Sequence, residues 1–159
     1  TVTSMDYSRP KYETSYDLSN EGSIIKIVSN KWNVNFCKLP MSYRLDYALY
    51  KSDNLRGFCE VKRRKYRKSD FQTYIISLDK VIKARELASI TNTKSVLIVS
   101  WVDVIGWIDF NNDFVCRQGG RVDRSDWQDV EPMCHFNIQE FKPIVDWRNN
   151  DKQVGEEQS

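Results

Sequence analysis

The spacing of hydrophobic residues near the start of the chain predicts a helix. Residues 1–16 are polar and show no sustained period, so we interpret them as an N-terminal arm. A helix is expected over about residues 20–31, with Ser19 or Asn20 as its cap, because both residue types accept hydrogen bonds from the first helical N–H groups. The residues that recur at helical spacing are Ile24, Ile25, Val28 and Trp32.

Alternating hydrophobic and polar residues then predict three strands. The first covers residues 34–39 and stops at Pro40. The next two cover residues 43–51 and 56–63 and are joined by a short polar turn, which is typical of a β-hairpin. Side chains two positions apart lie on the same face of a strand, so each strand presents a hydrophobic face and a mixed face.

The second half of the chain predicts another helix and further strands. A helix is expected over about residues 70–90, and a β-branched run over 95–101 predicts a strand that is buried on both faces. Strands follow over about 104–110 and 133–139, and the polar section 111–131 is interpreted as a loop. The apolar stripe of the helix consists of Phe71, Tyr74, Ile75, Leu78, Ile82 and Leu87. The order is αβββαβ followed by more strands, which indicates an α/β fold with a mixed sheet.

Length and composition add limits to this pattern. A chain of 159 residues favours a single domain, placed at residues 17–148, with a loose polar tail at 149–159. No apolar run approaches the roughly 18 residues of a membrane span, and no signal peptide is expected. One histidine and no C-x-x-C pair exclude multi-histidine metal sites and zinc ribbons, and no glycine-rich nucleotide loop is present.

Several polar or reactive residues receive structural interpretations. Cys37 and Cys59 lie in apolar runs and are expected to be reduced core residues, which suits a cytosolic protein. His135 falls in an apolar strand and is interpreted as a core histidine. A polar loop is favoured over a second phosphate contact for three arginines that flank a glycine pair: Arg117, Arg121 and Arg124.

The hairpin brings together residues that carry candidate chemistry. Asp46 lies on one strand, and Glu60 and Lys62 share a face of the next strand, so Asp46 can lie close to both. Two carboxylates and a backbone carbonyl would form an oxygen site that suits Mg²⁺ or Mn²⁺. Glu21 on the first helix could add a third carboxylate. A lysine beside such an ion can orient a water molecule or stabilise charge on phosphorus.

Spacing alone does not select this set. Glu140 and Lys142 repeat the E-x-K pattern, and Asp126 precedes Glu140 by the same interval, but no strand alternation surrounds Asp126 and no long helix can follow Lys142. The structural alternative for the first set is an exposed hairpin with cross-strand ion pairs.

With Glu21, Asp46 and the Glu60-x-Lys62 pair placed in this order, the chain resembles the PD-(D/E)XK nuclease superfamily. The order and spacing are similar to those of archaeal Holliday-junction resolvases and small phage endonucleases. The resemblance covers roughly residues 19–110 with the motif and extends loosely to 145 through SVLIVSWVDVIGWID and GGRVDRSDWQDVEPMCHFNI. It implies a restriction-endonuclease-like αβββαβ core with a mixed central sheet and extra C-terminal strands.

The resemblance also implies residue roles. Asp46, Glu60 and the carbonyl of Val61 would bind the metal, Lys62 would assist the water, and Glu21 would complete the site. Leu45 stands where the superfamily name has proline. Three residues compete for a supporting role on the following helix: Gln72, Ser77 and Lys80.

A run of basic residues, Lys62–Lys68, follows the motif and is interpreted as a phosphate-binding surface. Tyr66 within it could stack on a base or serve as a packing anchor. The residues expected to hold the DNA backbone are Arg63, Arg64, Lys65, Arg67 and Lys68. The resulting hypothesis is a Mg²⁺-dependent (or Mn²⁺-dependent) endonuclease of duplex or branched DNA, of phage type, which acts in the host cytoplasm and forms a homodimer. The alternative is a non-catalytic nucleic-acid-binding module that retains the nuclease fold.

Overall fold

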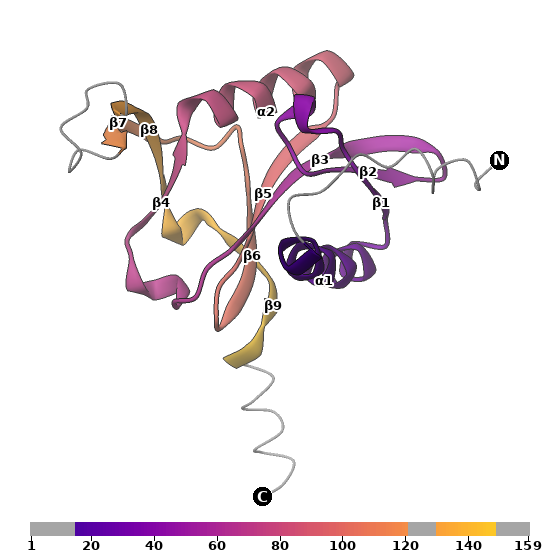
Figure 1. Ribbon diagram of the computed structural model, residues 1–159, viewed down its shortest axis with the longest axis horizontal. Helices are drawn as coiled ribbons and strands as arrows, with labels where there is room; N and C mark the ends of the chain where they lie inside the picture. Colours follow the sequence, from indigo (N-terminus) through magenta and orange to yellow (C-terminus); the bar gives the residue numbers. More distant parts are fainter. Residues whose placement is uncertain (1–14, 121–129, 149–159) are drawn as a thin grey trace, which may run out of the picture.

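A mixed sheet of six strands forms the centre of the protein, as seen in a computed structural model that describes residues 15–120 and 130–148 (Figure 1). The strands lie in the order β1-β2-β3-β5-β6-β9. β3 and β5 are parallel, and the other neighbouring pairs are antiparallel. The bounds are β1 Asn35–Lys38, β2 Tyr47–Lys51, β3 Asn54–Arg63, β5 Lys94–Ser100, β6 Val104–Asp109 and β9 Lys142–Asp146.

Two helices cover the faces of this sheet, α1 (Ser15–Trp32) and α2 (Leu78–Thr91). Ile25 and Val28 of α1 are fully buried in one hydrophobic cluster, and Val81 and Ala84 of α2 are buried in another. The strand β5 contributes to both clusters, with Leu97 and Val99 on the α2 side and Val96 and Ile98 on the α1 side. The prediction that residues 95–101 are buried on both faces is therefore confirmed.

A second sheet of three strands, in the order β4-β8-β7, packs on the α2 side of the molecule. Its strands are antiparallel, with bounds β4 Thr73–Ser77, β7 Val115–Gly120 and β8 Val130–Asn137. Tyr74, Ile76, Cys134 and Phe136 are buried on its inner face. Short 3-10 turns occupy Met41–Tyr43, Lys68–Asp70 and Ile138–Glu140.

The predicted αβββαβ order is confirmed, since α1, β1, β2, β3, α2 and β5 follow one another in the main fold. One strand, β4, is inserted between β3 and α2. The strands β6 and β8 are the expected C-terminal additions, and β7 and β9 are further strands. In the described part of the chain, no helix is both long and apolar enough to cross a membrane.

The prediction of one helix over 70–90 is wrong in its first part. Tyr74 and Ile76 are buried while Ile75 between them is 46% exposed, which is the period of a strand. The strand pairs with β8, and Ser77 then caps α2 by accepting a hydrogen bond from the Lys80 N–H. Ile82 is also exposed, because α2 buries Val81, Ala84 and Ala88 instead.

Three further boundaries differ from the predictions. The first helix begins at Ser15, so neither Ser19 nor Asn20 is its cap. The second strand begins at Tyr47, because a 3-10 turn precedes it and ends at Arg44 with a left-handed φ of 66°. The polar section 111–131 is not a loop throughout, since it contains β7 and the start of β8. The predicted arm, tail and the residues Asp126, Arg121 and Arg124 lie outside the described residues, apart from the arm's last two positions in α1.

Candidate metal and nucleic-acid site

Asp46 and Glu60 lie side by side because β2 and β3 form the expected hairpin. Tyr47 pairs with Cys59, so Asp46, directly before β2, lies opposite Glu60 of β3. The backbone N–H of Asp46 donates to the carbonyl of Cys59 at 3.0 Å. In return, the N–H of Val61 donates to Asp46 Oδ2 at 2.7 Å. These two bonds hold the Asp46 carboxylate against the strand that carries Glu60.

Glu60 is a buried carboxylate, with only 2% of its side chain exposed. Its Oε2 lies 3.4 Å from Lys62 Nζ and 3.2 Å from Lys80 Nζ, while its Oε1 is buried with no hydrogen-bond partner. Burial and the nearby charge of Asp46 raise the pKa of Glu60 to about 7, although Lys80 and Lys62 act in the opposite direction. Glu60 therefore changes its charge close to neutral pH.

Lys80 is the residue of α2 that contacts the carboxylate of Glu60. Its ammonium group contacts Glu60 Oε2 and also donates to the backbone carbonyl of Arg44. Of the three residues considered for the supporting role, Ser77 caps the helix, and Gln72 lies before β4. The sequence alone could not decide which of the three residues supports the site, because it did not show where α2 begins.

Lys38 links Glu21 to Asp46, and the sequence had not indicated this lysine. Lys38 Nζ lies 3.6 Å from Glu21 Oε1 and 3.5 Å from Asp46 Oδ1. Lys38 ends β1 and pairs with Tyr47, so the β1–β2 register places it beside Asp46. A correct prediction of the β1–β2 register would have identified Lys38 as a neighbour of Asp46. We call the group formed by Glu21, Lys38, Asp46, Glu60, Lys62 and Lys80 the carboxylate site.

The donors of the carboxylate site fit a hard divalent cation. Asp46 and Glu60 supply carboxylate oxygens, and Glu60 Oε1 is a buried acceptor that lacks a partner. Within residues 15–120 and 130–148, no group of three or more His, Cys, Asp or Glu side chains is placed to hold a metal ion by itself. A bound Mg²⁺ would therefore need the Val61 carbonyl and water as further ligands, and Mg²⁺ commonly retains several waters beside one or two carboxylates.

The family described as "Phage putative PDDEXK endonuclease" matches residues 7–144. The chain belongs to this family. This membership assigns it to the nucleases and confirms the resemblance to the PD-(D/E)XK superfamily. A Holliday junction resolvase from the archaeal hyperthermophile Archaeoglobus fulgidus is a similar solved structure, with a TM-score of 0.46 and 11% identity over 58% of this chain and 76% of the resolvase. No curated protein matches the chain.

A groove of about 250 Å³ opens beside the carboxylate site of this PD-(D/E)XK protein. Its walls come from α1, from the end of β3 and from the basic run Lys62–Lys68. The lining residues are Asn20, Glu21, Ile24, Val61, Lys62, Arg63 and Lys65. The groove thus joins a predicted metal ligand, the predicted catalytic lysine and two predicted phosphate-binding residues on one surface.

The basic run has exposed side chains on a fixed backbone. Arg63, Lys65 and Arg67 are exposed. The backbone is held where Val102 N–H donates to the Tyr66 carbonyl at 3.1 Å and where Lys68 N–H donates to Asp103 Oδ1 at 3.1 Å. These bonds place the exposed charges at defined positions on the surface.

Two members of the basic run are committed to packing. The guanidinium of Arg64 lies 5.3 Å from the centre of the Tyr74 ring. Tyr66 packs edge-on against Phe71 with the ring centres 4.8 Å apart, so in this structure it is a packing anchor. The exposed cations that could contact a phosphate backbone are therefore Arg63, Lys65 and Arg67, rather than every basic residue of the run.

The other candidates are distributed away from the carboxylate site. Glu140 is exposed on a 3-10 turn, and Arg117 is exposed on β7. His135 is half-buried on the outer face of the small sheet, so its interpretation as a core histidine is wrong. Cys37 is exposed, contrary to expectation, whereas Cys59 is buried as expected. Burial, reinforced by the charges of Asp46 and Glu60, raises the pKa of the Cys59 thiol.

Proposed function

We propose that this protein is a divalent-metal-dependent endonuclease that hydrolyses phosphodiester bonds in DNA. Asp46, Glu60 and the carbonyl of Val61 would hold Mg²⁺ or Mn²⁺. The observation that carries this proposal is the buried, unpartnered Glu60 Oε1 beside Asp46, in a chain of a nuclease family. A binding module gains nothing from two adjacent carboxylates close to DNA phosphates, because like charges repel.

Each residue of the carboxylate site has a role in this proposal. When bound, the metal polarises a phosphoryl oxygen and lowers the pKa of a water molecule. Lys62, with 39% of its side chain exposed, is able to orient the attacking water and to stabilise charge on the phosphorus. Lys80 lowers the pKa of Glu60 and so favours the ionised carboxylate that a metal requires. Glu21 lines the groove, and Lys38 lies between Glu21 and Asp46.

The basic surface supplies the substrate affinity in this proposal. Arg63, Lys65 and Arg67 would contact the DNA backbone, which positions the strand and reads little sequence. Water attacks the phosphorus in line with the bond to the 3′ oxygen and loses a proton to solvent, that P–O bond breaks, and the leaving 3′ oxygen takes a proton from solvent to become a hydroxyl. The activity would operate in the cytoplasm of the phage host, on duplex or branched DNA. Paired cuts across a four-way junction would require a homodimer.

A cleavage screen tests the proposal directly. Single strands, duplexes, flaps and four-way junctions are incubated with the protein in Mg²⁺, in Mn²⁺ and in EDTA. We expect metal-dependent products from at least one substrate and none in EDTA. Calorimetric titration of Mg²⁺ distinguishes the alternative, since a non-catalytic binding module should neither cleave DNA nor bind the ion. Absence of both signals would overturn the proposal.

A further inference from the structure

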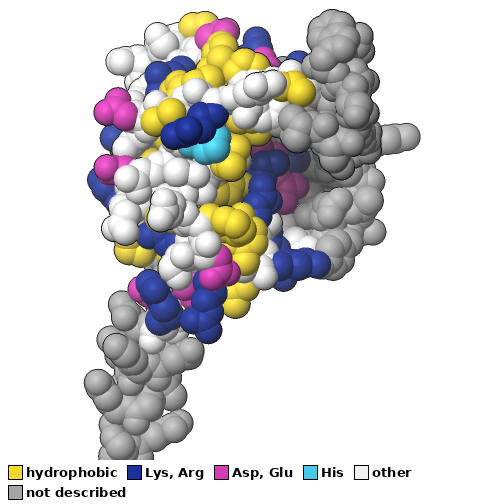
Figure 2. All heavy atoms as spheres, turned by 90° about the vertical axis from the view of Figure 1, so that its left-hand side faces the viewer, with side chains coloured by type: hydrophobic (Ala, Val, Ile, Leu, Met, Phe, Trp, Pro, Cys, Tyr) yellow, Lys and Arg dark blue, Asp and Glu magenta, His cyan; other side chains and the backbone are white. Residues whose placement is uncertain are grey.

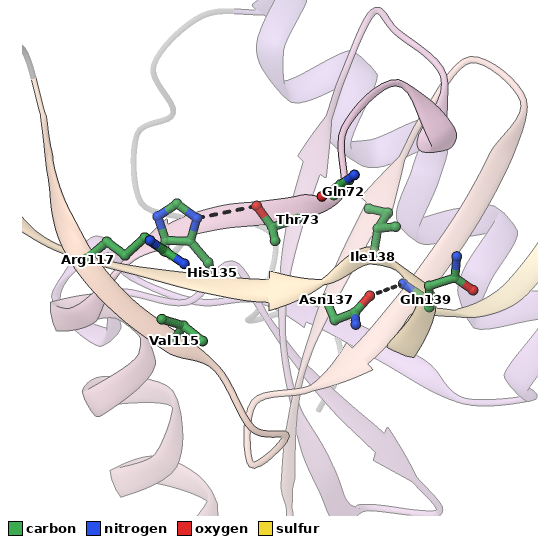
Figure 3. A pocket seen from close by; sticks show the side chains of 8 residues that line it. All are labelled: Gln72, Thr73, Val115, Arg117, His135, Asn137, Ile138 and Gln139. Carbon is green, nitrogen blue, oxygen red and sulfur yellow. Dashed lines mark hydrogen bonds between the residues drawn. The ribbon is translucent and has the colours of Figure 1, made fainter.

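The outer face of the three-stranded sheet carries a groove that the proposed hydrolysis does not use. Its volume is about 420 Å³, and it lies over β4, β8 and β7 (Figure 3). Figure 3 shows Arg117 and Val115 from β7 beside His135 from β8, with Thr73 on the neighbouring strand β4 and Asn137 at the end of β8. We call this the outer groove. It contains side chains from strands that are distant in the sequence.

The polar groups of the outer groove are already oriented. Thr73 Oγ1 and His135 Nδ1 are 3.3 Å apart and share a hydrogen bond, which leaves Nε2 of the ring for a ligand. The N–H of Gln139 donates to Asn137 Oδ1 at 2.9 Å, so the amino group of Asn137 remains as a donor. A ligand would therefore meet a prearranged set of donors and acceptors.

The lining favours a nucleobase over a phosphate. It combines amide side chains, one arginine and one histidine with the apolar side chains of Val115 and Ile138, and none of the lining residues is a carboxylate. Asn, Gln and Arg form paired hydrogen bonds with base edges, and apolar side chains contact base faces. Phosphate sites instead use several cations, whereas this lining contains a single arginine and no lysine.

The outer groove is within reach of DNA bound at the carboxylate site. Thr73 starts β4, and Lys80, which contacts Glu60, lies in the first turn of α2 directly after that strand. At rises of about 3.3 Å per strand residue and about 1.5 Å per helix residue, the Cα atoms of Thr73 and Lys80 are within about 20 Å of each other. The basic run connects β3 to β4. Figure 2 shows the histidine beside basic and hydrophobic side chains, with basic and acidic side chains in a hollow of the same face.

We propose that the outer groove binds an unpaired nucleobase of a nucleic-acid strand, and that Arg117, His135 and Asn137 contact its polar edge. The identity of the strand as the substrate rests on the proposed function, but base binding itself does not. Such a site would select a base a few nucleotides from the scissile phosphate. It would give an otherwise backbone-directed nuclease a preference for unpaired or branched DNA.

The single histidine of the chain permits a direct test by NMR. The imidazole signals of His135 are followed in the metal-free 159-residue protein during titration with the four 2′-deoxynucleoside 5′-monophosphates, up to about 50 mM. The matched probe is 2-deoxyribose 5-phosphate, which lacks only the base. We expect a saturable shift with at least one nucleotide and none with the sugar phosphate. Equal shifts with both probes, or no shift with any nucleotide, would overturn the proposal.

A pair of isosteric variants tests which face of the sheet is involved. Asn137→Asp keeps the oxygen that accepts from Gln139 N–H but replaces the amino donor by a carboxylate. We expect this variant to weaken nucleotide binding about tenfold or more. Gln118→Glu is the control, because Gln118 is exposed on β7 but alternates to the face opposite Arg117. Equal losses in the two variants would contradict a site in the outer groove.

The proposal can fail independently of the nuclease function. The NMR titration contains no metal and requires no cleavage, so a negative result leaves the carboxylate site untouched. Conversely, a failed cleavage screen would not remove a base-dependent shift of His135.

Discussion

Lys80 Nζ lies 3.2 Å from Glu60 Oε2, which joins the first turn of α2 to the middle of β3. The same ammonium group donates to the carbonyl of Arg44, just before Asp46. One lysine thus contacts β3 at Glu60 and the turn before β2, two residues from Asp46. We infer that α2 helps to hold the carboxylate site together and favours the ionised form of Glu60, against the effects of burial and of Asp46.

Removing either predicted metal ligand should abolish cleavage. Asp46→Asn and Glu60→Gln each replace a charged oxygen donor by a neutral amide of similar size. We expect cleavage in Mg²⁺ to fall by at least about 100-fold, because metal coordination supplies several kcal/mol of transition-state stabilisation. Far-UV circular dichroism should show that the fold is retained. Glu140→Gln is the control, because this exposed glutamate belongs to the second E-x-K sequence, and its activity should stay near that of the wild type.

The stability of the metal-free protein should depend on pH through Glu60. Its pKa is raised from 4.5 to about 7 in the folded state, so the protonated form is favoured by folding. This contribution is complete below about pH 4.5 and is lost as pH rises through 7. The difference between the two pKa values corresponds to about 3 kcal/mol.

Urea denaturation at several pH values in EDTA measures this effect. Between pH 5 and pH 8, the free energy of unfolding of Glu60→Gln should rise relative to that of the wild type by up to about 3 kcal/mol. The comparison removes the contribution of titrating groups that do not interact with Glu60. If the two proteins showed parallel pH profiles, Glu60 would have an ordinary pKa.

Lys38 should compete with the divalent cation. Its ammonium group lies within 3.6 Å of both Glu21 and Asp46 carboxylate oxygens, so it neutralises charge that would otherwise attract a metal. We expect Lys38→Met to tighten Mg²⁺ binding several-fold in calorimetry and to reduce the stability of the metal-free protein. Lys83→Met on the opposite helix is the control, and it should change neither quantity. Weaker Mg²⁺ binding in Lys38→Met would contradict the competition.

Lys62 should affect turnover more than metal binding. Its Nζ contacts Glu60 at 3.4 Å, but its side chain is partly exposed toward the groove where a phosphate would lie. We expect Lys62→Met to lower the rate at saturating Mg²⁺ by about 100-fold while the ion affinity changes little. A variant with weakened ion binding and an unchanged rate at saturation would instead assign Lys62 a role at the metal.

The exposed cations of the basic run should determine the salt dependence of DNA binding. Arg63, Lys65 and Arg67 are replaced together by Ala, and Arg64 is kept because it packs on Tyr74. The slope of log affinity against log salt should fall by about two to three units for every DNA sequence. Fluorescence anisotropy in EDTA measures this slope. Arg56→Ala, at an exposed position near the start of β3, controls for a general loss of charge. An unchanged slope in the triple variant would exclude the basic run from DNA binding.

Local patterns were sufficient to predict the hairpin and the meeting of its carboxylates. The two strands are adjacent in the sequence, their side chains alternate, and a short polar turn joins them, so their pairing depends on neighbouring residues alone. Asp46 and Glu60 could therefore be placed together before the structure was known. The strand at 95–101 was equally predictable, because side chains of its β-branched run pack into both hydrophobic clusters.

Long-range contacts decided the rest. The spacing of Phe71, Tyr74, Ile75 and Leu78 suits a helix, yet residues 73–77 form a strand because β8, about 60 residues later, offers its backbone for pairing. That change moved the start of α2 and brought Lys80, rather than Gln72, to Glu60. Lys38 reached Asp46 through the register of β1 on β2. His135 lines an open groove because alternation on β8 specifies two faces, and only the packing of the small sheet determines which one is buried.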